Sequence, residues 1–423
     1  MNQLEFQRRT MALIGILWLA ACAGTSVPVG GGAATQTDTA VDVGVDLGIP
    51  PVDTLPTDLT APPELPPADS VDTAPTAPET SSPIAWTPFS ATAGSNARGV
   101  TLSTGRIAWE EDGVIQVHDL ATKMTWTAVG KSEPGAHREP VLDSDRLVFT
   151  NDRTGDRDLW VLDLATKTLK ALVVAPGDQL APSLDHGLLA WIDRRSGAHD
   201  ALASELWSMD LDVAGAAARQ LTSDAVEQAW PHVRGRRVVF TDFSKDVDKK
   251  LTGLPESPID HNSDNGDILG LDVPIDAASA VPKAFVITDD PNKQARPAVD
   301  GDAVAWLDWR GITPEPKYAR FKIYARVGAQ AEQLLGETGW NTAELWRRPA
   351  IQGSRVAWVM EATAAGLSGP HAVYVGNLTT QKPAKAVPET SGLLLAVDLR
   401  EDALAWAGPG HVGLLPLTAV PSE

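Results

Sequence analysis

Residues 140–164 read PVLDSDRLVFTNDRTGDRDLWVLDL, and this stretch decides the fold. It contains a proline, a short apolar run, a polar turn, a second apolar run with an aromatic residue, the motif Asp-Arg-x-Gly, and a third apolar run that ends in Asp-Leu. Residues 182–211 repeat this order, from Pro182 through Trp191 to Leu211. The runs are short, alternate between apolar and polar residues, and are separated by turn residues, a pattern that predicts β-strands.

The aromatic residue of this unit recurs seven times along the chain. These seven anchors are Trp109, Phe149, Trp191, Phe240, Trp306, Trp358 and Trp406. In five of the seven units a proline lies nine residues before the anchor: Pro140, Pro182, Pro231, Pro297 and Pro349. Periods of about 40 to 50 residues with about four strands each are typical of propeller blades. The sequence therefore predicts an all-β, seven-bladed β-propeller over residues 83–423, with the anchors packed between blades.

The two ends of this region indicate how the ring closes. The last unit has its second strand at residues 404–407 and its third near residues 412–417, and it then runs out before a fourth strand. Residues 84–89, Ile-Ala-Trp-Thr-Pro-Phe, form a strand with no blade before it. We expect this N-terminal strand to complete the last blade, because closure removes the free edge of an open ring.

The repeat resembles that of the TolB-like, WD40-like β-propellers of bacterial envelopes. The best matches are residues 140–164 and 182–211, and the resemblance covers residues 83–423. It implies a propeller fold and a binding role, with a protein of the envelope as the natural partner. It does not specify a ligand.

The first residues predict a lipoprotein signal. Two arginines, Arg8 and Arg9, precede an apolar run of ten residues that ends before Cys22. A bilayer-spanning helix needs about 20 apolar residues, so residues 1–21 are interpreted as a signal peptide. The segment Leu-Ala-Ala-Cys resembles the lipobox of bacterial lipoprotein precursors, which implies lipidation of Cys22.

This resemblance also bears on location, with two alternatives left open. Residue 23 is Ala rather than Asp, which by resemblance favours the outer membrane, so we expect membrane contact through the lipid anchor only. An ordinary secretory signal with a coincidental cysteine is one alternative. A twin-arginine signal is the other, although Thr-Met-Ala after the arginine pair fits that pattern poorly.

Residues 22–82 are predicted to be a linker rather than a domain. They are rich in Pro, Thr, Ala, Gly and Asp, and no Lys or Arg occurs between Arg9 and Arg98. Such a segment lacks the apolar content to offset its ordering entropy, and its like charges repel. We expect a disordered spacer between the lipidated Cys22 and the propeller.

The overall composition restricts the partners. The formal net charge is -20, which argues against a nucleic-acid partner, because phosphate recognition needs basic residues. The single cysteine allows neither an internal disulfide nor a multi-thiolate metal site. We expect a monomer.

The candidate binding site is a channel mouth. In a propeller the first strand of each blade lines the central channel, so residues just before the recurring proline should converge at one rim. Arginine and tryptophan are frequent there, which favours an anion- or peptide-binding mouth. Solvated loop residues are the alternative interpretation. The candidate residues are Arg138, Glu139, Trp230, Arg296, Trp346, Arg347 and Arg348.

One segment has the spacing of a calcium loop. Oxygen-bearing side chains occur at Asp260, Asn262 and Asp264, followed by Gly266. The glycine is one place late and no Glu occupies position 12, so a plain polar turn is the alternative to a calcium site. No other cofactor is expected.

The motifs of common enzymes are missing from the sequence. It contains no Gly-x-Ser-x-Gly elbow, no His-Glu-x-x-His and no glycine-rich phosphate loop. The leading hypothesis is therefore a binding or scaffolding module for an envelope protein or glycan. The second is a propeller enzyme, such as a polysaccharide lyase or glycan hydrolase, which would need converging carboxylates or histidines at the channel mouth. A surface protein with another structural role is the third.

Overall fold

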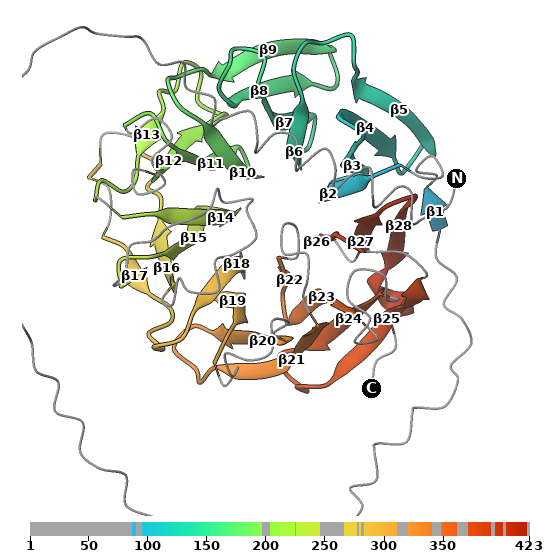
Figure 1. The fold of residues 1–423 in the computed structure, drawn as a ribbon, viewed down its shortest axis with the longest axis vertical. Helices are drawn as coiled ribbons and strands as arrows, with labels where there is room; N and C mark the ends of the chain where they lie inside the picture. The colour runs from blue at the N-terminus through green and yellow to red at the C-terminus, as the bar shows by residue number, and fades with distance from the viewer. Residues whose placement is uncertain are drawn as a thin grey trace, which may run out of the picture. The chain divides into compact units, whose positions relative to one another are not determined.

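The computed structural model describes residues 87–89, 95–196, 204–224, 226–245, 266–276, 279–280, 283–310, 320–340, 348–361, 371–390, 394–400 and 403–420. Within these ranges, strands β1 to β28 form seven four-stranded antiparallel sheets. The sheets stand around a central axis as blades (Figure 1), so the predicted seven-bladed propeller is confirmed. The signal peptide, Cys22 and the linker lie outside the described residues. No helix in the described part is long and apolar enough to cross a bilayer.

The first two strands of each blade lie nearest the axis. The first strands are β2 (Ala97–Ser103), β6 (His137–Asp143), β10 (Gln179–Asp185), β14 (Gln228–Arg234), β18 (Gln294–Asp300), β22 (Ala350–Gln352) and β26 (Ala396–Arg400). The second strands are β3 (Arg106–Glu111), β7 (Arg146–Asn151), β11 (Leu188–Asp193), β15 (Arg237–Asp242), β19 (Ala303–Asp308), β23 (Arg355–Glu361) and β27 (Ala403–Gly408).

The third and fourth strands form the outer part of the blades. The third strands are β4 (Val114–Asp119), β8 (Asp158–Asp163), β12 (Glu205–Asp210), β16 (Asp267–Asp272), β20 (Arg320–Val327), β24 (His371–Asn377) and β28 (His411–Pro416). The fourth strands of the first six blades are β5 (Met124–Val129), β9 (Thr168–Val173), β13 (Arg219–Gln220), β17 (Phe285–Val286), β21 (Gln333–Trp340) and β25 (Pro383–Thr390).

The seventh sheet combines the two ends of the described region. Its order is β1-β28-β27-β26, and β1 (Thr87–Phe89) runs antiparallel to β28 with Thr87 opposite Leu414. The strand expected from the sequence was longer, residues 84–89. Its first three residues lie outside the described part of the chain.

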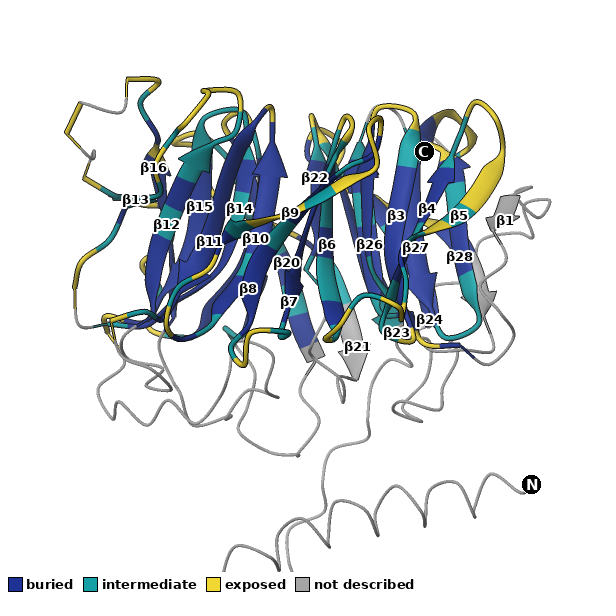
Figure 2. Cartoon of the chain, turned by 90° about the horizontal axis from the view of Figure 1, so that it is seen from above, coloured by how far each residue is buried: buried dark blue, intermediate teal, exposed yellow. Residues whose placement is uncertain are grey.

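The aromatic anchors occupy the second strands and form the core. All seven are at most 2% exposed. Each packs against the preceding blade: Trp306 contacts Val239 and Ile268 of the fourth blade, and Trp109 contacts Ala405 and Ala407 of the seventh. The predicted packing of anchors between blades is confirmed. Burial of a large ring at every blade interface stabilises the ring as a whole. Figure 2 shows that buried residues follow the strands and exposed ones gather at the turns.

The third and fifth blades each contain a closed loop of side-chain contacts around the anchor. In the third blade the Trp191 Nε1–H donates to Asp193 Oδ2 at 2.9 Å, and Arg195 donates to both Asp193 oxygens at 2.9 and 2.6 Å. The Arg195 guanidinium lies 3.9 Å over the ring of Trp207, which itself stacks on Trp191. The fifth blade repeats this loop with its own Trp, Asp, Arg and a Tyr. The sequence motif is therefore Trp-x-Asp-x-Arg, and the partner of Asp193 is Arg195 rather than its neighbour Arg194.

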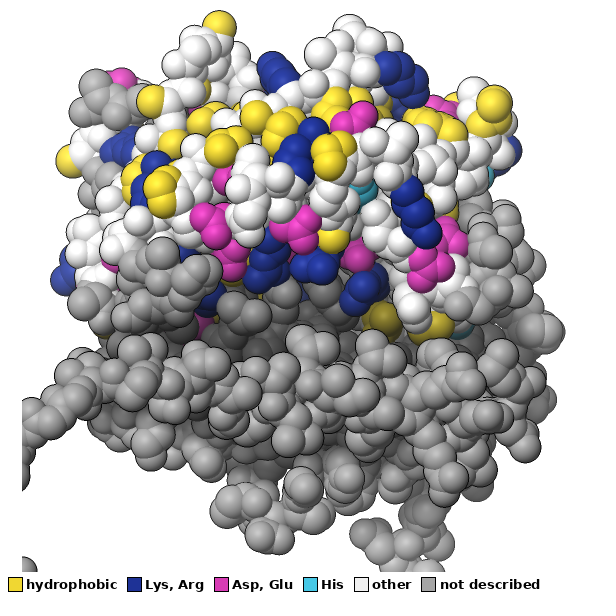
Figure 3. Space-filling model, turned by 45° about the horizontal axis from the view of Figure 1, so that its top comes forward, with side chains coloured by type: hydrophobic (Ala, Val, Ile, Leu, Met, Phe, Trp, Pro, Cys, Tyr) yellow, Lys and Arg dark blue, Asp and Glu magenta, His cyan; other side chains and the backbone are white. Residues whose placement is uncertain are grey.

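The outer wall mixes charge and hydrophobic surface. Arg153 lies 3.8 Å over the Trp160 ring, and Lys167 lies 4.7 Å over Trp126. The surface presented in Figure 3 accordingly carries basic, acidic and hydrophobic side chains interspersed with one another. Cations placed over indole rings contribute about 0.5–1 kcal/mol each at exposed sites.

A glycine faces the last anchor where no larger residue fits. Gly413 on β28 pairs with Trp406 on β27, and a methyl group at Gly413 would overlap the indole ring. We expect Gly413→Ala to lower the free energy of unfolding by about 1–3 kcal/mol, the usual range for overpacking, as measured by urea denaturation. Gly130→Ala is the matched control, because a methyl group there meets only ordinary contacts at 3.6 Å or more. Equal stabilities of the two variants would contradict this packing.

Candidate binding site in the central channel

All seven first strands line one cavity on the propeller axis. Its volume is about 180 Å³. In five blades the first strand carries a bulge, where the register to the second strand shifts by one residue. In four of these the residue before the proline has a left-handed backbone, with φ between 49° and 57°: Glu139, Ala181, Trp230 and Arg296. Proline suits a bulge because it has no N–H to pair, and the bulge brings the preceding residue to the cavity.

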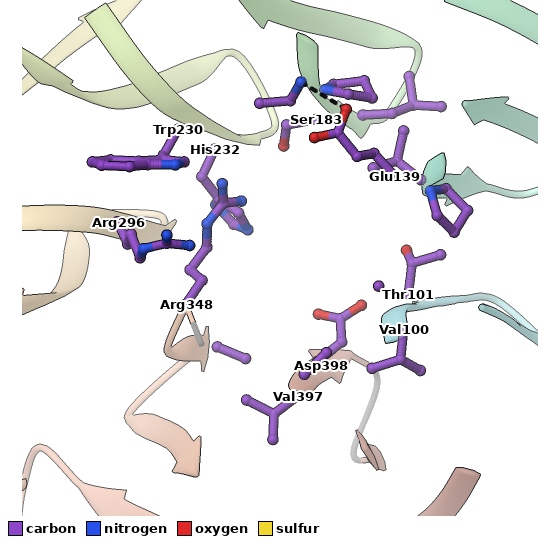
Figure 4. A pocket seen from close by; sticks show the side chains of 18 of the residues that line it. Val100, Thr101, Glu139, Ser183, Trp230, His232, Arg296, Arg348, Val397 and Asp398 are labelled. Carbon is purple, nitrogen blue, oxygen red and sulfur yellow. Dashed lines mark hydrogen bonds between the residues drawn. The ribbon is translucent and has the colours of Figure 1, made fainter. Parts of the chain in front are cut away.

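These bulge positions make the rim of the cavity asymmetric. Blades four to six contribute Trp230, Arg296 and Arg348, all large side chains. Blade two contributes Glu139. Blades one, three and seven contribute the small residues Gly99, Ala181 and Ala396. Figure 4 shows the result: Trp230, Arg296 and Arg348 lie on one side of the hollow, and Glu139 lies on the other.

Below the rim, side chains join neighbouring blades. The residue after the bulge accepts a backbone N–H from the next blade: Thr101 Oγ1 from Leu142 at 3.3 Å, and Ser183 Oγ from Val233 at 3.0 Å. Asp398 Oδ2 accepts from Leu102 at 2.6 Å, across the seam between the seventh and first blades. Because first strands of adjacent blades share no ladder, these bonds satisfy backbone groups that would otherwise be buried unpaired.

His232 occupies the same layer in the fourth blade. Its Nδ1 accepts the N–H of Val299 at 3.1 Å, which leaves Nε2 as the protonated nitrogen of a neutral ring. Burial, and the charges of Arg348, Arg234 and Arg400, hold its pKa well below the usual value. The ring is therefore a neutral hydrogen-bond donor in the cavity at physiological pH.

An ion-paired floor crosses the channel at the other end of the first strands. Arg400 of the seventh blade donates to Asp185 Oδ1 of the third blade at 2.6 Å. Arg234 of the fourth blade lies 3.6 Å from the same oxygen and 3.4 Å from Asp300 Oδ1. Arg234 also donates to the carbonyls of Ile351 and Leu399 at 3.2 and 3.3 Å. Arg400 also lines the cavity, so this ion-paired layer borders the cavity at that end.

Arg348 contributes a guanidinium group to the cavity wall. Burial lowers the pKa of its guanidinium to about 10, while the carboxylates of Asp398 and Glu139 act to raise it. The group is therefore charged at neutral pH. Within the described part of the chain, no hydrogen bond or ion pair reaches the Arg348 side chain. The Arg348 side chain is half-buried, and because no direct partner meets its charge in the described part of the chain, this group is available to an anion from outside the protein.

The acidic side of the cavity is anchored by the backbone. Glu139 Oε2 accepts the Ala181 N–H at 3.1 Å. Burial raises the pKa of the Glu139 carboxyl, although the charge of Arg157 and the bond from Ala181 act in the opposite direction. Asp398 accepts from Leu102 and from the N–H of Leu399 at 2.9 Å. Both carboxyl groups are thus held in place, with oxygen lone pairs left for a ligand.

An aromatic cluster supports the basic side. Trp230 packs edge-on against Phe243, with ring centroids 6.1 Å apart, and both belong to a buried cluster with Ala229 and Ala295. The Arg296 guanidinium lies 4.7 Å over the Trp230 ring. Stacking on a rigid ring fixes the plane of the guanidinium, which favours planar, two-point recognition of an anion.

The structure brings together four of the residues expected at the channel mouth. Glu139, Trp230, Arg296 and Arg348 all line the cavity. Arg138 does not. It lies in β6 opposite Thr150, and its charge acts on the carboxyl groups of Glu110 and Glu139. Trp346 and Arg347 lie outside the described residues, as do the calcium-loop candidates Asp260, Asn262 and Asp264. The described residues contain no group of three His, Cys, Asp or Glu side chains that could hold a metal ion.

Other cavity residues were not expected from the sequence. Thr101, Ser183 and His232 come directly after the bulge, and Asp398 has the equivalent place in the seventh blade, a layer below the predicted rim. Counting one residue beyond each proline would have found Ser183 and His232. Asp398 and Thr101 were missed because the seventh and first units have valine where the other units have proline.

Comparison with known proteins shows the fold. No family model matches the chain, and no curated protein matches its sequence. A puromycin hydrolase structure aligns with a TM-score of 0.54 at 12% identity, covering 77% of this chain and 53% of that one. An oligogalacturonate lyase from Vibrio parahaemolyticus aligns with a TM-score of 0.52 at 10% identity, covering 78% of this chain and 96% of that one.

The chain is also distantly similar to TolB. TolB from Acinetobacter baumannii aligns at 15% identity with a TM-score of 0.42, covering 66% of this chain and 63% of that chain's length. At such identities these matches show the β-propeller fold alone. The similar structures include enzymes and TolB, and activity is not carried over from any of them.

Proposed function

We propose that this protein is a lipid-anchored envelope protein whose propeller is a non-catalytic binding module, with the open end of the channel as its binding site. A protein or glycan of the envelope is the proposed partner. The observation that carries the binding role is the cavity on the propeller axis with Arg348 in its wall and no direct partner for that charge among the described residues. Concave sites with a few fixed polar groups are the usual place for ligands.

We also propose that the N-terminal strand closes the ring. The antiparallel register of β1 with β28 supports this, since it places residues 87–89 at the edge of the seventh blade. In this arrangement the linker from Cys22 would join the propeller at the seam between the seventh and first blades. A tether at the seam would hold the domain at the end of a spacer.

The binding role is tested by capture from crosslinked cell envelopes. Anchored wild-type protein is compared with Arg348→Glu and with Arg146→Glu. Arg146 is the matched control, because its ion pair with Asp212 is at the surface and away from the cavity. We expect at least one partner to be captured by wild type and by the Arg146 variant and lost from the Arg348 variant. An identical set of captured molecules for all three proteins would contradict a binding site at the channel.

The lipid anchor is tested by Cys22→Ser. Without the thiol no diacylglycerol can be attached, and several acyl chains are what holds such a protein stably on a membrane. We expect the variant to move from the membrane fraction to the soluble fraction after cell lysis, measured by immunoblotting. Ser26→Ala, in the same linker, should stay with membranes. Retention of Cys22→Ser in the membrane fraction would contradict the anchor.

A further inference from the structure

The charges around the cavity are separated rather than mixed. Above the floor, guanidinium groups come from blades five and six, as Arg296 and Arg348, while Arg400 of the seventh blade also lines the cavity but is paired with Asp185. Carboxyl groups come from blades seven and two, as Asp398 and Glu139, and the first blade between them contributes the uncharged residues Gly99, Val100 and Thr101. Among the described residues no ion pair joins Arg348 to either carboxyl group, although Arg400 and Asp185 do pair directly in the floor beneath. The described cavity thus has a basic side and an acidic side that do not neutralise each other by contact.

This separation restricts the ligand on both sides. A group that fits the basic side must be an anion, and a planar carboxylate matches the fork of an arginine better than a compact ion does. The Nε2–H of His232 adds a neutral donor on that side. A dianion such as phosphate would be disfavoured, because Glu139 and Asp398 line the same small hollow and like charges repel at such range.

The acidic side calls for a cationic donor. Glu139 and Asp398 each have their position fixed by backbone N–H groups, and neither makes a direct ion pair among the described residues. An ammonium group on this side would have two carboxyl groups available to bind it. The volume of about 180 Å³ is below the roughly 300 Å³ at which typical ligand pockets begin, so the ligand must be small.

We propose that the cavity binds a zwitterion with an amine and a carboxylate, either a free amino acid or a dipeptide, with the carboxylate on Arg348, Arg296 and His232 and the amine between Glu139 and Asp398. This rests on the proposed binding role of the channel and assigns its ligand class. The flat face of Trp230 lines the same wall and would contact an apolar side chain of the ligand.

The test uses calorimetry on the purified full-length protein in detergent with five probes. These are alanine, alanyl-alanine, acetyl-alanyl-alanine, alanyl-alanine amide and inorganic phosphate. We expect alanine or alanyl-alanine to bind, and acetylation and amidation each to weaken dipeptide binding by about tenfold or more, because each removes a charge-assisted hydrogen bond. Alanine and alanyl-alanine distinguish the two sources of the zwitterion.

Two variants test which side of the cavity binds the carboxylate and which side binds the amine. Arg348→Ala should abolish the preference for the free carboxylate, and Glu139→Gln should reduce the preference for the free amine. Arg146→Ala is the control and should bind as wild type does. Circular dichroism and a thermal melt establish whether each variant is folded. If a variant does not fold, the series of probes measured on the wild-type protein alone still tests the proposal.

Several results would overturn the zwitterion. These are no binding of either unblocked probe, equal binding of blocked and unblocked dipeptides, and tighter binding of phosphate. If one of them is found while Arg348→Glu still loses a partner in the capture experiment, the ligand class is wrong and the binding role of the channel stands. If the unblocked probes bind and no captured partner depends on Arg348, the site holds a small solute and the partner proposal fails instead.

Discussion

Replacing Asp185 by asparagine is expected to lower the free energy of unfolding by about 3–5 kcal/mol, the range for removing one partner of a buried ion pair. Asp185 has a fully buried side chain and lies against Arg400 and Arg234 in the channel floor. Its Oδ2 also accepts the N–H of Gly235 at 2.6 Å. The variant would leave two guanidinium groups beneath the cavity without their shared counter-charge. Urea denaturation at neutral pH measures the loss.

The contribution of Asp185 to stability should depend on pH. Burial acts to raise the pKa of Asp185, but Arg400, the Gly235 N–H, His186 and Arg234 outweigh it and hold the pKa below the usual value. A lowered native pKa contributes stability above the unfolded value of about 3.9, and this contribution is lost as the pH falls through the native pKa. The difference between wild type and Asp185→Asn should therefore be constant above about pH 5 and shrink below about pH 4.

The matched control is an exposed pair of the same type. Asp145 pairs with Arg106 and has a side chain that is 51% exposed. Asp145→Asn should change stability by less than about 1 kcal/mol, as is usual for surface pairs. Arg400→Met in the Asp185→Asn background should restore part of the loss, because it removes an uncompensated charge. A loss for Asp185→Asn no larger than that for Asp145→Asn would show that the floor contributes no net stability.

The periodic part of the fold could be predicted from sequence. An anchor such as Trp191 is buried by the same local pattern in every unit, so the spacing between anchors indicates where each blade lies. The proline nine residues before the anchor indicates the position of the bulge. The bulge in turn brought Glu139, Trp230 and Arg296 to the cavity that Arg348 of the sixth blade also lines. These features depend on local backbone geometry repeated around a ring, and that geometry is visible in the repeat.

The contacts across the channel could not be predicted in this way. Arg400 and Asp185 are 215 residues apart and lie in the seventh and third blades. Their contact depends on the diameter of the closed ring and on side chains that differ from blade to blade at one position. The equivalent residues of other blades include Ser103 and Gln352, so the repeat contains no signal for the pair. For this reason the residues of the rim could be predicted from the repeat, whereas the ion pairs of the floor could not.

The second large loss of stability is expected on substitution of Trp306, which belongs to the side-chain loop of the fifth blade. The Trp306 ring is 0% exposed, and its Nε1–H donates to Asp308 Oδ2 at 2.9 Å. Arg310 donates to both Asp308 oxygens, at 2.9 and 2.7 Å, and lies 4.3 Å over Tyr324. Tyr324 stacks on Trp306 with ring centroids 6.3 Å apart. One indole thus fills the blade interface and also satisfies a buried carboxylate.

Trp306→Ala is therefore expected to lower the free energy of unfolding by about 3–5 kcal/mol, as for other buried tryptophans. Trp306→Phe keeps a ring and removes the N–H, so it isolates the bond to Asp308, which costs about 1–3 kcal/mol when a buried acceptor loses its donor. Trp358→Phe is the matched control, because Trp358 Nε1–H donates to the Glu337 carbonyl at 3.2 Å rather than to a carboxylate. Urea denaturation of the three variants gives the comparison. If the two phenylalanine variants lose the same stability, the carboxylate loop adds nothing to the ring packing; a larger loss at Trp306 would mean that the Trp-x-Asp-x-Arg motif stabilises the blades in which it occurs.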